Sequence, residues 1–408
     1  IDNNLSLEGK RKEIQKSKYG VSENRSKLLP QINAIAGYNN NFDPPVSVTD
    51  GSSYGVPYNI TKTLQHSANA GLEMQMPLFN QTLYTSMSIA KVMEEISRLS
   101  YGKAREDVIL QISKMYYLGQ VTAEQIMLIK ANITRLEELR DITQAFFDNG
   151  MSMEVDLKRV NINLENLKVQ YDNAQAMMKQ QLNMLKYIID YPAEKEIALT
   201  PVNTDSITTV ALTGLSENIY ELQLSQSQVQ LAERQKKIIT NGYIPSLSLT
   251  GSWRYAAYTD KGYHWFHSGP SNQWFRSYGV GLTLRIPIFD GLDKTYKIKK
   301  AMIDIENKRL AWEDARKNLQ TQYLNAVNDL MNNQRNFKKQ KDNYLLAEDV
   351  YAVTSDRYRE GIASMTEVLQ DEMQMSEAQN NYISAHYNYR VTNLMLLKLT
   401  GQIESLVK

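Results

Sequence analysis

Apolar and polar residues follow two different periods along this chain, and the two periods separate strand-like from helix-like stretches. In residues 67–79 apolar and polar positions alternate, with Leu72 on the apolar side and Glu73 and Gln75 on the polar side. Alternation with a period of two indicates a strand with one apolar and one polar face. The same alternation occurs in three further stretches, 31–42, 245–258 and 276–289. We therefore expect four amphipathic strands.

Two long regions without proline, 78–191 and 288–408, are expected to be helical. Proline interrupts helices because it lacks a backbone N–H and clashes with the preceding turn. In each region a long helix is predicted, followed by a shorter one, and another short helix precedes each pair of strands. The predicted long helices are 82–147 and 292–359, and the shorter ones are 1–29, 152–189, 216–242 and 364–399. At about 1.5 Å per residue, each long helix extends roughly 100 Å.

The helix at 152–189 carries an apolar seam. Val160, Leu164 and Leu167 keep alternating four- and three-residue spacings, which indicates coiled-coil packing. An ordinary amphipathic helix on a globular core gives a similar pattern. The length of the long helices favours the coiled coil, because a helix of that length needs a partner along its whole extent.

Each long helix is expected to end at a glycine turn. Gly150 and Gly361 lie 211 positions apart, and glycine adopts the left-handed conformation of a helix end at little steric cost. Ser152 lies two residues after the first glycine. In the second turn Ser364 precedes Glu367 by three residues, and this spacing predicts a capping box at the start of the last helix.

The two turns belong to a longer internal duplication. Each half of the chain is predicted to run helix, strand, loop, strand, long helix, turn, helix, and its landmarks repeat at offsets between 210 and 215. The first repeat is 1–189, the second is 216–408, and a threonine-rich linker at 190–215 joins them. Residues 43–65, rich in proline and glycine, are expected to form a loop. Because the sequence opens inside a helical pattern at Ile1, we expect residues to precede it.

Composition excludes several classes of function. The chain has 46 basic residues (Lys and Arg) and 45 acidic residues (Asp and Glu). Nucleic-acid-binding proteins usually have an excess of basic residues, so we expect no nucleic-acid partner. The chain has no cysteine, which excludes disulfides and thiolate metal sites. His264 and His267 fall in a predicted surface loop without a ligand set around them. With no catalytic motif present, we expect no enzyme, no cofactor and no bound metal.

The strands are long enough to cross a bilayer at a tilt. Their polar face carries Glu73, Gln75, Arg254 and Arg285 as candidate residues of a water-filled lumen. A soluble sheet with one solvated face gives the same alternation, so this pattern leaves both readings open. Aromatic residues at the strand ends and in the adjoining loops favour a membrane, where such residues gather at the interfaces.

Four strands cannot close a barrel alone, and an open edge in lipid leaves backbone groups unpaired. Several copies must then combine. Two copies give eight strands, with an interior filled by side chains, and three give twelve, which can hold a channel. A polar inner face favours the homotrimer. The fold class expected is therefore mainly α, with long antiparallel coiled-coil helices and four strands per protomer contributing to a membrane β-barrel. The alternative is a coiled-coil scaffold, not a channel, with a soluble β end.

Six short segments, in this order and duplicated, resemble the TolC-like outer-membrane efflux family over nearly the whole chain. They are Leu28-Leu29-Pro30, Met76-Pro77-Leu78-Phe79, Ile286-Pro287-Ile288-Phe289-Asp290-Gly291, Arg357-Tyr358-Arg359-Glu360-Gly361, Ser364 with Glu367-Val368-Leu369, and Leu399-Thr400-Gly401. The resemblance implies a trimer with a twelve-stranded barrel in outer-membrane lipid and a helical tunnel in the periplasm. It also implies work as the passive exit duct for an inner-membrane pump and a periplasmic adaptor.

The resemblance also implies roles for residues at the turns. In the family the helix turns form the periplasmic gate, where acidic side chains ring the lumen and the adaptor docks. Gly150, Ser152, Gly361 and Ser364 occupy these turns. Asp156 and Glu367 match the acidic position, and Tyr358 matches the tyrosine of the turn signature, where the first repeat has Phe147.

The family's second acidic residue would align with Gln370, whereas the nearest carboxylate here is Asp371. A purely structural reading stays open for two of the acidic positions. Glu367 can serve only as the capping-box residue, and Asp156 can serve only as a favourable charge near a helix N-terminus.

Overall fold

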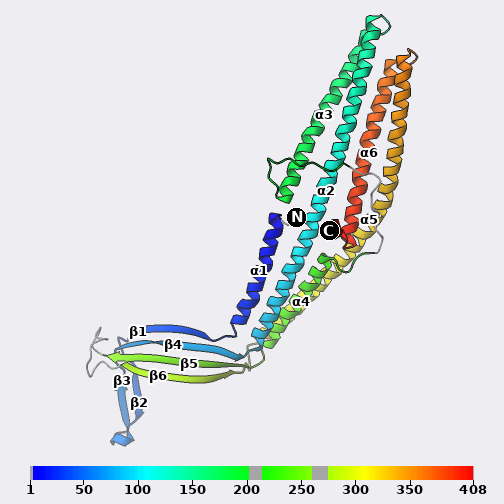
Figure 1. Ribbon diagram of the computed structural model, residues 1–408. Helices are drawn as coiled ribbons and strands as arrows, with labels where there is room; N and C mark the ends of the chain where they lie inside the picture. The colour runs from blue at the N-terminus through cyan, green and yellow to red at the C-terminus, as the bar shows by residue number, and fades with distance from the viewer. Residues whose placement is uncertain (1–2, 202–213, 260–273, 408) are drawn as a thin grey trace. The chain divides into compact units, whose positions relative to one another are not determined.

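The computed structural model describes residues 3–201, 214–259 and 274–407, and each half of the chain holds the same series of long elements (Figure 1). The helices are α1 (Leu5–Ser26), α2 (Gln81–Asp148), α3 (Glu154–Ile189), α4 (Tyr220–Asn241), α5 (Asp293–Arg359) and α6 (Met365–Leu399). The strands are β1 (Gln31–Asn40), β2 (Val46–Asp50), β3 (Tyr58–Lys62), β4 (His66–Phe79), β5 (Ser246–Thr259) and β6 (Trp274–Arg285). Two 3-10 turns, η1 (Ser52–Tyr54) and η2 (Ile403–Val407), complete the described elements.

The chain divides into two compact units, and each unit takes segments from both repeats. The first is helical and comprises Ile1–Ile14, Ile96–Gln226 and Leu310–Lys408. The second comprises Gln15–Glu95 and Ser227–Arg309 and contains the strands. No helix within the described ranges has a stretch that is long and apolar enough to cross a membrane.

In the second unit the long strands form an antiparallel four-stranded sheet in the order β1-β4-β5-β6. The central pair, β4 and β5, joins the two repeats. The strand register places apolar residues opposite apolar residues and polar residues opposite polar residues across all four strands. Ala34, Leu72, Trp253 and Tyr278 form one row, and Asn33, Glu73, Ser252 and Gly279 form the next. One face of the sheet is therefore apolar and the other polar, as the sequence predicts.

Two strands end earlier than the sequence analysis predicts. The last strand, expected over 276–289, ends at Arg285. Pro287 follows two residues later and has no N–H to donate to a ladder. The first, expected over 31–42, ends at Asn40, three residues before the Asp43-Pro44-Pro45 segment.

Residues 43–65 hold a hairpin where the sequence analysis expects a loop. β2 and β3 pair antiparallel, with Val48 opposite Ile60. Each strand has only five residues, and prolines precede the hairpin and interrupt its turn, so the alternation is too short to stand out against the loop composition. Gly55 in the turn has φ of 70°, a left-handed conformation that glycine accepts without strain.

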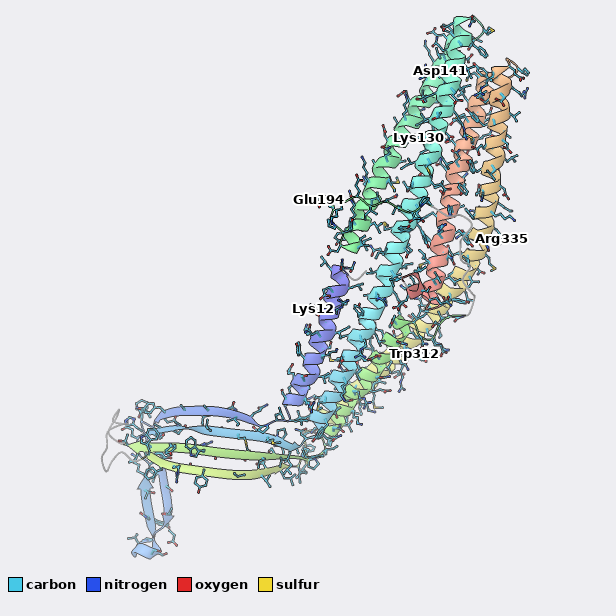
Figure 2. All side chains as sticks on the ribbon, viewed as in Figure 1. Lys12, Lys130, Asp141, Glu194, Trp312 and Arg335 are labelled. Atoms are coloured by element: carbon cyan, nitrogen blue, oxygen red, sulfur yellow. The ribbon has the colours of Figure 1, made fainter. Side chains whose placement is uncertain are left out.

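In the first unit α2, α3, α5 and α6 pack around one apolar core, as the predicted seam requires. Val160, Leu164 and Leu167 of α3 are buried there against Leu136 of α2 and Val368 of α6. α2 and α3 run antiparallel, and so do α5 and α6 (Figure 1). Charged side chains such as Lys130 and Asp141 lie on the exposed surface of α2 (Figure 2). The helices therefore pack as coiled coils along a buried seam with a polar exterior.

The end of α3 and the start of α1 meet within this unit, and one side chain joins them. The Asn4 Nδ2 donates to the carbonyl oxygen of Ile188 at the end of α3, at 2.6 Å. The Asn4 Oδ1 accepts from the N–H of Leu7 in the first turn of α1, at 3.0 Å. The second repeat has a related junction, where the N–H of Ser216 donates to the carbonyl of Leu399, at 3.2 Å. Each junction satisfies backbone groups that a helix end leaves unpaired.

Candidate functional site

The two helix turns have the same backbone geometry. Gly150 and Gly361 have φ of 72° and 75°. The N–H of Gly150 donates to Phe147 O at 2.9 Å, and that of Gly361 donates to Tyr358 O at 2.9 Å. The next residue in each turn donates to the carbonyl five positions back, at 2.8 Å in both cases. This pair of bonds defines a Schellman motif, which requires a left-handed residue and explains the glycine.

The helices that follow the two turns begin differently. At the second turn the Ser364 Oγ accepts from Glu367 N at 3.3 Å, and the Glu367 Oε2 accepts from Ser364 N at 2.9 Å. This is the predicted capping box. At the first turn the N-cap position is Met153, whose side chain makes no cap hydrogen bond. Ser152 lies one residue too early, and its buried Oγ has no partner among the described residues.

One arginine connects the two turns of the protomer. The Arg159 Nη1 lies 3.3 Å from Asp156 Oδ1 and 3.3 Å from Thr366 Oγ1. Asp156 therefore has an ion-pair partner in its own helix, and that partner also donates to the start of α6. The sequence analysis missed Arg159, although its position three residues after Asp156 places both side chains on one helix face.

The other acidic candidates occupy different environments. Glu367 is exposed at the start of α6 and takes part in the capping box. Asp371 is half-buried one turn further along α6. Glu367 thus has the structural role that the sequence analysis left open for it, and Asp156 has an ion pair in addition to its place near a helix start.

Tyr358 lies in the core beneath the second turn. Its side chain is buried, and its hydroxyl donates to Thr143 Oγ1 of α2 at 3.2 Å. Its ring packs against Phe146, with 5.6 Å between ring centroids. The tyrosine of the turn signature therefore joins α5 to α2.

Below the turns, Arg135 of α2 joins polar groups of three helices. It forms an ion pair with Glu348 of α5. It donates to Asn132 Oδ1 at 3.0 Å and contacts the Met375 sulfur of α6 at 3.6 Å. The Asn132 Nδ2 in turn donates to Gln379 Oε1 at 2.7 Å. Sequence alone gives no signal for this cluster, because its α2 residues lie more than 200 positions from its α5 and α6 residues.

A second buried polar cluster lies further along the same helices. His386 of α6 is fully buried, and its Nδ1 lies 3.3 Å from Glu124 Oε2 of α2. The Arg390 Nε donates to His386 Nε2 at 2.9 Å, so Nε2 accepts and Nδ1 carries the proton. Tyr382 donates to the other Glu124 oxygen at 2.9 Å. Burial raises the pKa of Glu124, but the hydrogen bonds from His386 and Tyr382 outweigh it and leave that pKa below its usual value.

Glu372 is a buried carboxyl without such partners. It is 4% exposed, and its Oε1 has no hydrogen-bond partner among the described residues. Burial raises the pKa of Glu372 from 4.5 to about 7. Burial also raises the pKa of Tyr351, and the negative charge of Glu372 adds to that effect, so that the pKa of Tyr351 rises to about 12.

The predicted lumen residues of the strands lie together on the polar face of the sheet. Glu73 and Arg254 form an ion pair between β4 and β5. Gln75 lies opposite Thr250, and Arg285 lies opposite Ser246 at the end of β6. His264 and His267 fall outside the described residues, as do residues 202–213 of the linker.

A duplicated chain with four amphipathic strands and two helical hairpins that end in matched turns is the protomer fold of outer-membrane channels. The solved structure of CusC, described as forming a transmembrane channel, superposes with a TM-score of 0.80 at 16% identity, over 98% of this chain and 89% of that one. The sequence profile of the outer membrane efflux protein family matches residues 1–189 and 211–402, so the chain belongs to that family.

Two relatives agree with this assignment. Outer membrane protein TolC of Vibrio cholerae is 21% identical over 399 residues, which cover 94% of this chain and 84% of the relative. The probable efflux pump outer membrane protein TtgC of Pseudomonas putida is 23% identical, over 88% of this chain and 75% of the relative. The chain is thus an outer-membrane protein of a channel family and not an enzyme.

The difference between the two helix starts predicts opposite effects of two substitutions. Ser364→Ala removes a capping box, and we expect it to destabilise the start of α6 by about 1 kcal/mol. Met153→Ser supplies an N-cap hydroxyl three residues before Asp156, and we expect it to stabilise the start of α3 by about 0.5–1 kcal/mol. Hydrogen exchange of the amides in the first turn of each helix measures both effects. Faster exchange in Met153→Ser than in the parent would contradict the assignment.

The buried carboxyl predicts a dependence of stability on pH. Because burial holds the pKa of Glu372 near 7, against 4.5 when solvated, the folded helices lose stability as pH rises from about 4.5 towards 7, by at most about 3 kcal/mol. Glu372→Gln should therefore melt at a higher temperature than the parent at pH 8 and at a similar temperature at pH 4.5. Glu377→Gln, on the exposed side of the same helix, is the control. An equal effect of Glu372→Gln at both pH values would contradict the prediction.

Proposed function

We propose that three copies of this chain form a passive outer-membrane channel, which conducts substrates outward from a periplasmic adaptor and an inner-membrane pump and is gated at the helix turns. The single observation that carries the proposal is the four-stranded sheet itself. It has one apolar and one polar face, and its edge strands β1 and β6 have no further strand partner in the described chain.

The unpaired edges support an oligomer. In lipid each unpaired backbone group costs several kcal/mol, and β1 and β6 have 10 and 12 residues. Pairing β6 of one copy with β1 of the next satisfies both edges and closes a barrel. With strands about 4.8 Å apart and tilted by about 40°, twelve strands give a backbone radius of roughly 12 Å. That radius leaves room for water beyond the inward side chains.

The helix turns of the first unit support a gate. Arg159 contacts groups of both turns, and Asp156, Glu367 and Asp371 place carboxylates near them. Acidic side chains that ring a narrow opening favour cations and bind divalent ions. Opening requires the two helical hairpins to separate, which breaks the hydrogen bond between Arg159 and Thr366. The pump and adaptor are proposed because the relative TtgC is named for an efflux pump.

Cysteine cross-linking tests the proposed trimer. The chain has no cysteine of its own, so introduced pairs report without background. We expect Asn33→Cys on β1, combined with one cysteine at a time along β6, to give covalent dimers and trimers in outer-membrane fractions at one register. Gln75→Cys with Thr250→Cys is the matched control, because these residues lie opposite each other in one chain and should close without adding mass. Monomers at every register, or material found only in the soluble fraction, would favour the scaffold alternative.

Single-channel recording tests the gate. We expect replacement of Asp156, Glu367 and Asp371 by amides to weaken block by divalent cations, because the carboxylates that bind them are removed. Arg159→Gln should raise the open probability, because it removes the contact with Thr366. Arg309→Gln is the control, since its ion pair with Glu233 lies away from the turns in sequence. Unchanged block and unchanged opening in these variants would remove the turns as the gate.

A further inference from the structure

We propose that the polar face of the strands selects for anionic substrates. Arg285 is the selecting residue, and the Glu73–Arg254 ion pair adds no net charge to this face. This inference rests on the proposed trimeric channel. It concerns the strand region and is separate from the acidic gate at the helix turns. It follows from which charged side chains the register places on the polar face, and from which of them are neutralised.

The register places three charged side chains on the polar face among the described strand residues. They are Glu73 of β4, Arg254 of β5 and Arg285 of β6. The remaining polar-face positions are mainly Asn, Gln, Ser, Thr and Gly. Arg276 also belongs to β6, but it lies opposite Tyr255 and therefore on the apolar face, in the row that continues through Ala70.

Glu73 and Arg254 neutralise each other. Arg254 lies directly opposite Gly71, and Glu73 lies directly opposite Ser252, so the ion pair runs diagonally across the two strands. Gly71 lies close against β5 at this point, because a Cβ there would lie 2.3 Å from the Trp253 carbonyl oxygen and 3.0 Å from the Arg254 Cγ. The middle of the polar face therefore carries polar groups but no net charge.

Arg285 has no such partner. It is exposed at the last position of β6, opposite Ser246, and its side chain forms no hydrogen bond or ion pair within the residues that the structure describes. The nearest carboxylate along the chain, Asp290, already forms an ion pair with Lys294 at 2.8 Å. The net charge of the polar face is thus the positive charge of Arg285, and three copies place three such charges around the lumen at one level.

The size of the effect depends on the ionic strength. The guanidinium groups lie within roughly 10 Å of the axis of a twelve-stranded barrel. The Debye length is about 30 Å at 0.01 M salt and about 3 Å at 1 M. Three charges at this distance in water favour an anion and disfavour a cation, so they should change the ratio of anion to cation permeability by about tenfold to twentyfold at low salt and by very little at high salt.

Reversal potentials of the purified channel in a planar bilayer, under a gradient of KCl near 0.01 M, test the proposal. We expect Arg285→Gln to lower the chloride-to-potassium permeability ratio by about tenfold to twentyfold, and Arg285→Lys to preserve it. Arg276→Gln, on the other face of the same strand, is the control and should leave the ratio unchanged. All variants keep the acidic turns, so these do not contribute to the differences.

The ion pair is tested by a double-mutant cycle. Glu73→Gln leaves Arg254 uncompensated and should raise the ratio, and Arg254→Gln leaves Glu73 uncompensated and should lower it. Glu73→Gln with Arg254→Gln together, and the exchanged pair Glu73→Arg with Arg254→Glu, should both return the ratio of the parent. A merely structural role for the pair predicts altered assembly without this change of sign.

The outcomes separate the inference from the function on which it rests. A parent protein that forms no conducting pores overturns the proposed channel. Normal conductance with an unchanged permeability ratio in Arg285→Gln overturns the charge selection alone. A ratio that shifts equally at low and high salt also overturns it, because a screened charge cannot act in that way.

Discussion

Backbone hydrogen bonding at the edges of the four-stranded sheet is the constraint on which the rest of this molecule depends. β4 and β5 lie inside the sheet and have strand partners on both sides, whereas β1 and β6 each have one side without a strand partner among the described residues. The apolar face belongs against lipid, where no water can satisfy those groups. Each repeat contributes one central strand and one edge strand to the sheet. In the proposed trimer, β6 of each copy pairs with β1 of the next, so that every edge around the barrel has a partner.

In the helical unit, polar contacts between α2 and α6 recur at successive levels of an otherwise apolar seam. Glu124 accepts from Tyr382 at 2.9 Å, and Asn132 donates to Gln379 at 2.7 Å. Apolar seams alone tolerate sliding by one turn, whereas a buried hydrogen-bonded group is satisfied at one register only. These levels therefore specify how the two repeats align along their length.

The two helix turns show how a duplicated feature can diverge while its backbone geometry is kept. Both turns use a left-handed glycine and the same pair of hydrogen bonds, since the helix end imposes this geometry. The following helix starts differ, because a side-chain cap is worth only about 1 kcal/mol and can be lost where other packing compensates. Ser364 keeps the cap, while Met153 occupies the equivalent position in the first repeat.

The sequence by itself determined the local elements of this protein, because each depends on short-range periodicity or on turn chemistry. The period of two in the strands, the proline-free helices, the seam through Val160 and Leu164, and the glycine turns were all readable in this way. The hairpin at 46–62 was not, since its strands are only five residues long. The candidate acidic residues were located by position alone, without their partners.

Only the tertiary structure decided which distant groups meet. The contacts of Arg159 with Thr366, of Tyr358 with Thr143 and of Arg254 with Glu73 join residues 181 to 215 positions apart. No local pattern encodes such pairs, because each side chain taken alone is an ordinary polar residue on a helix or strand. The same holds for Arg285 and Glu372, whose side chains lack partners among the described residues, because a sequence does not reveal such a lack before the chain is folded.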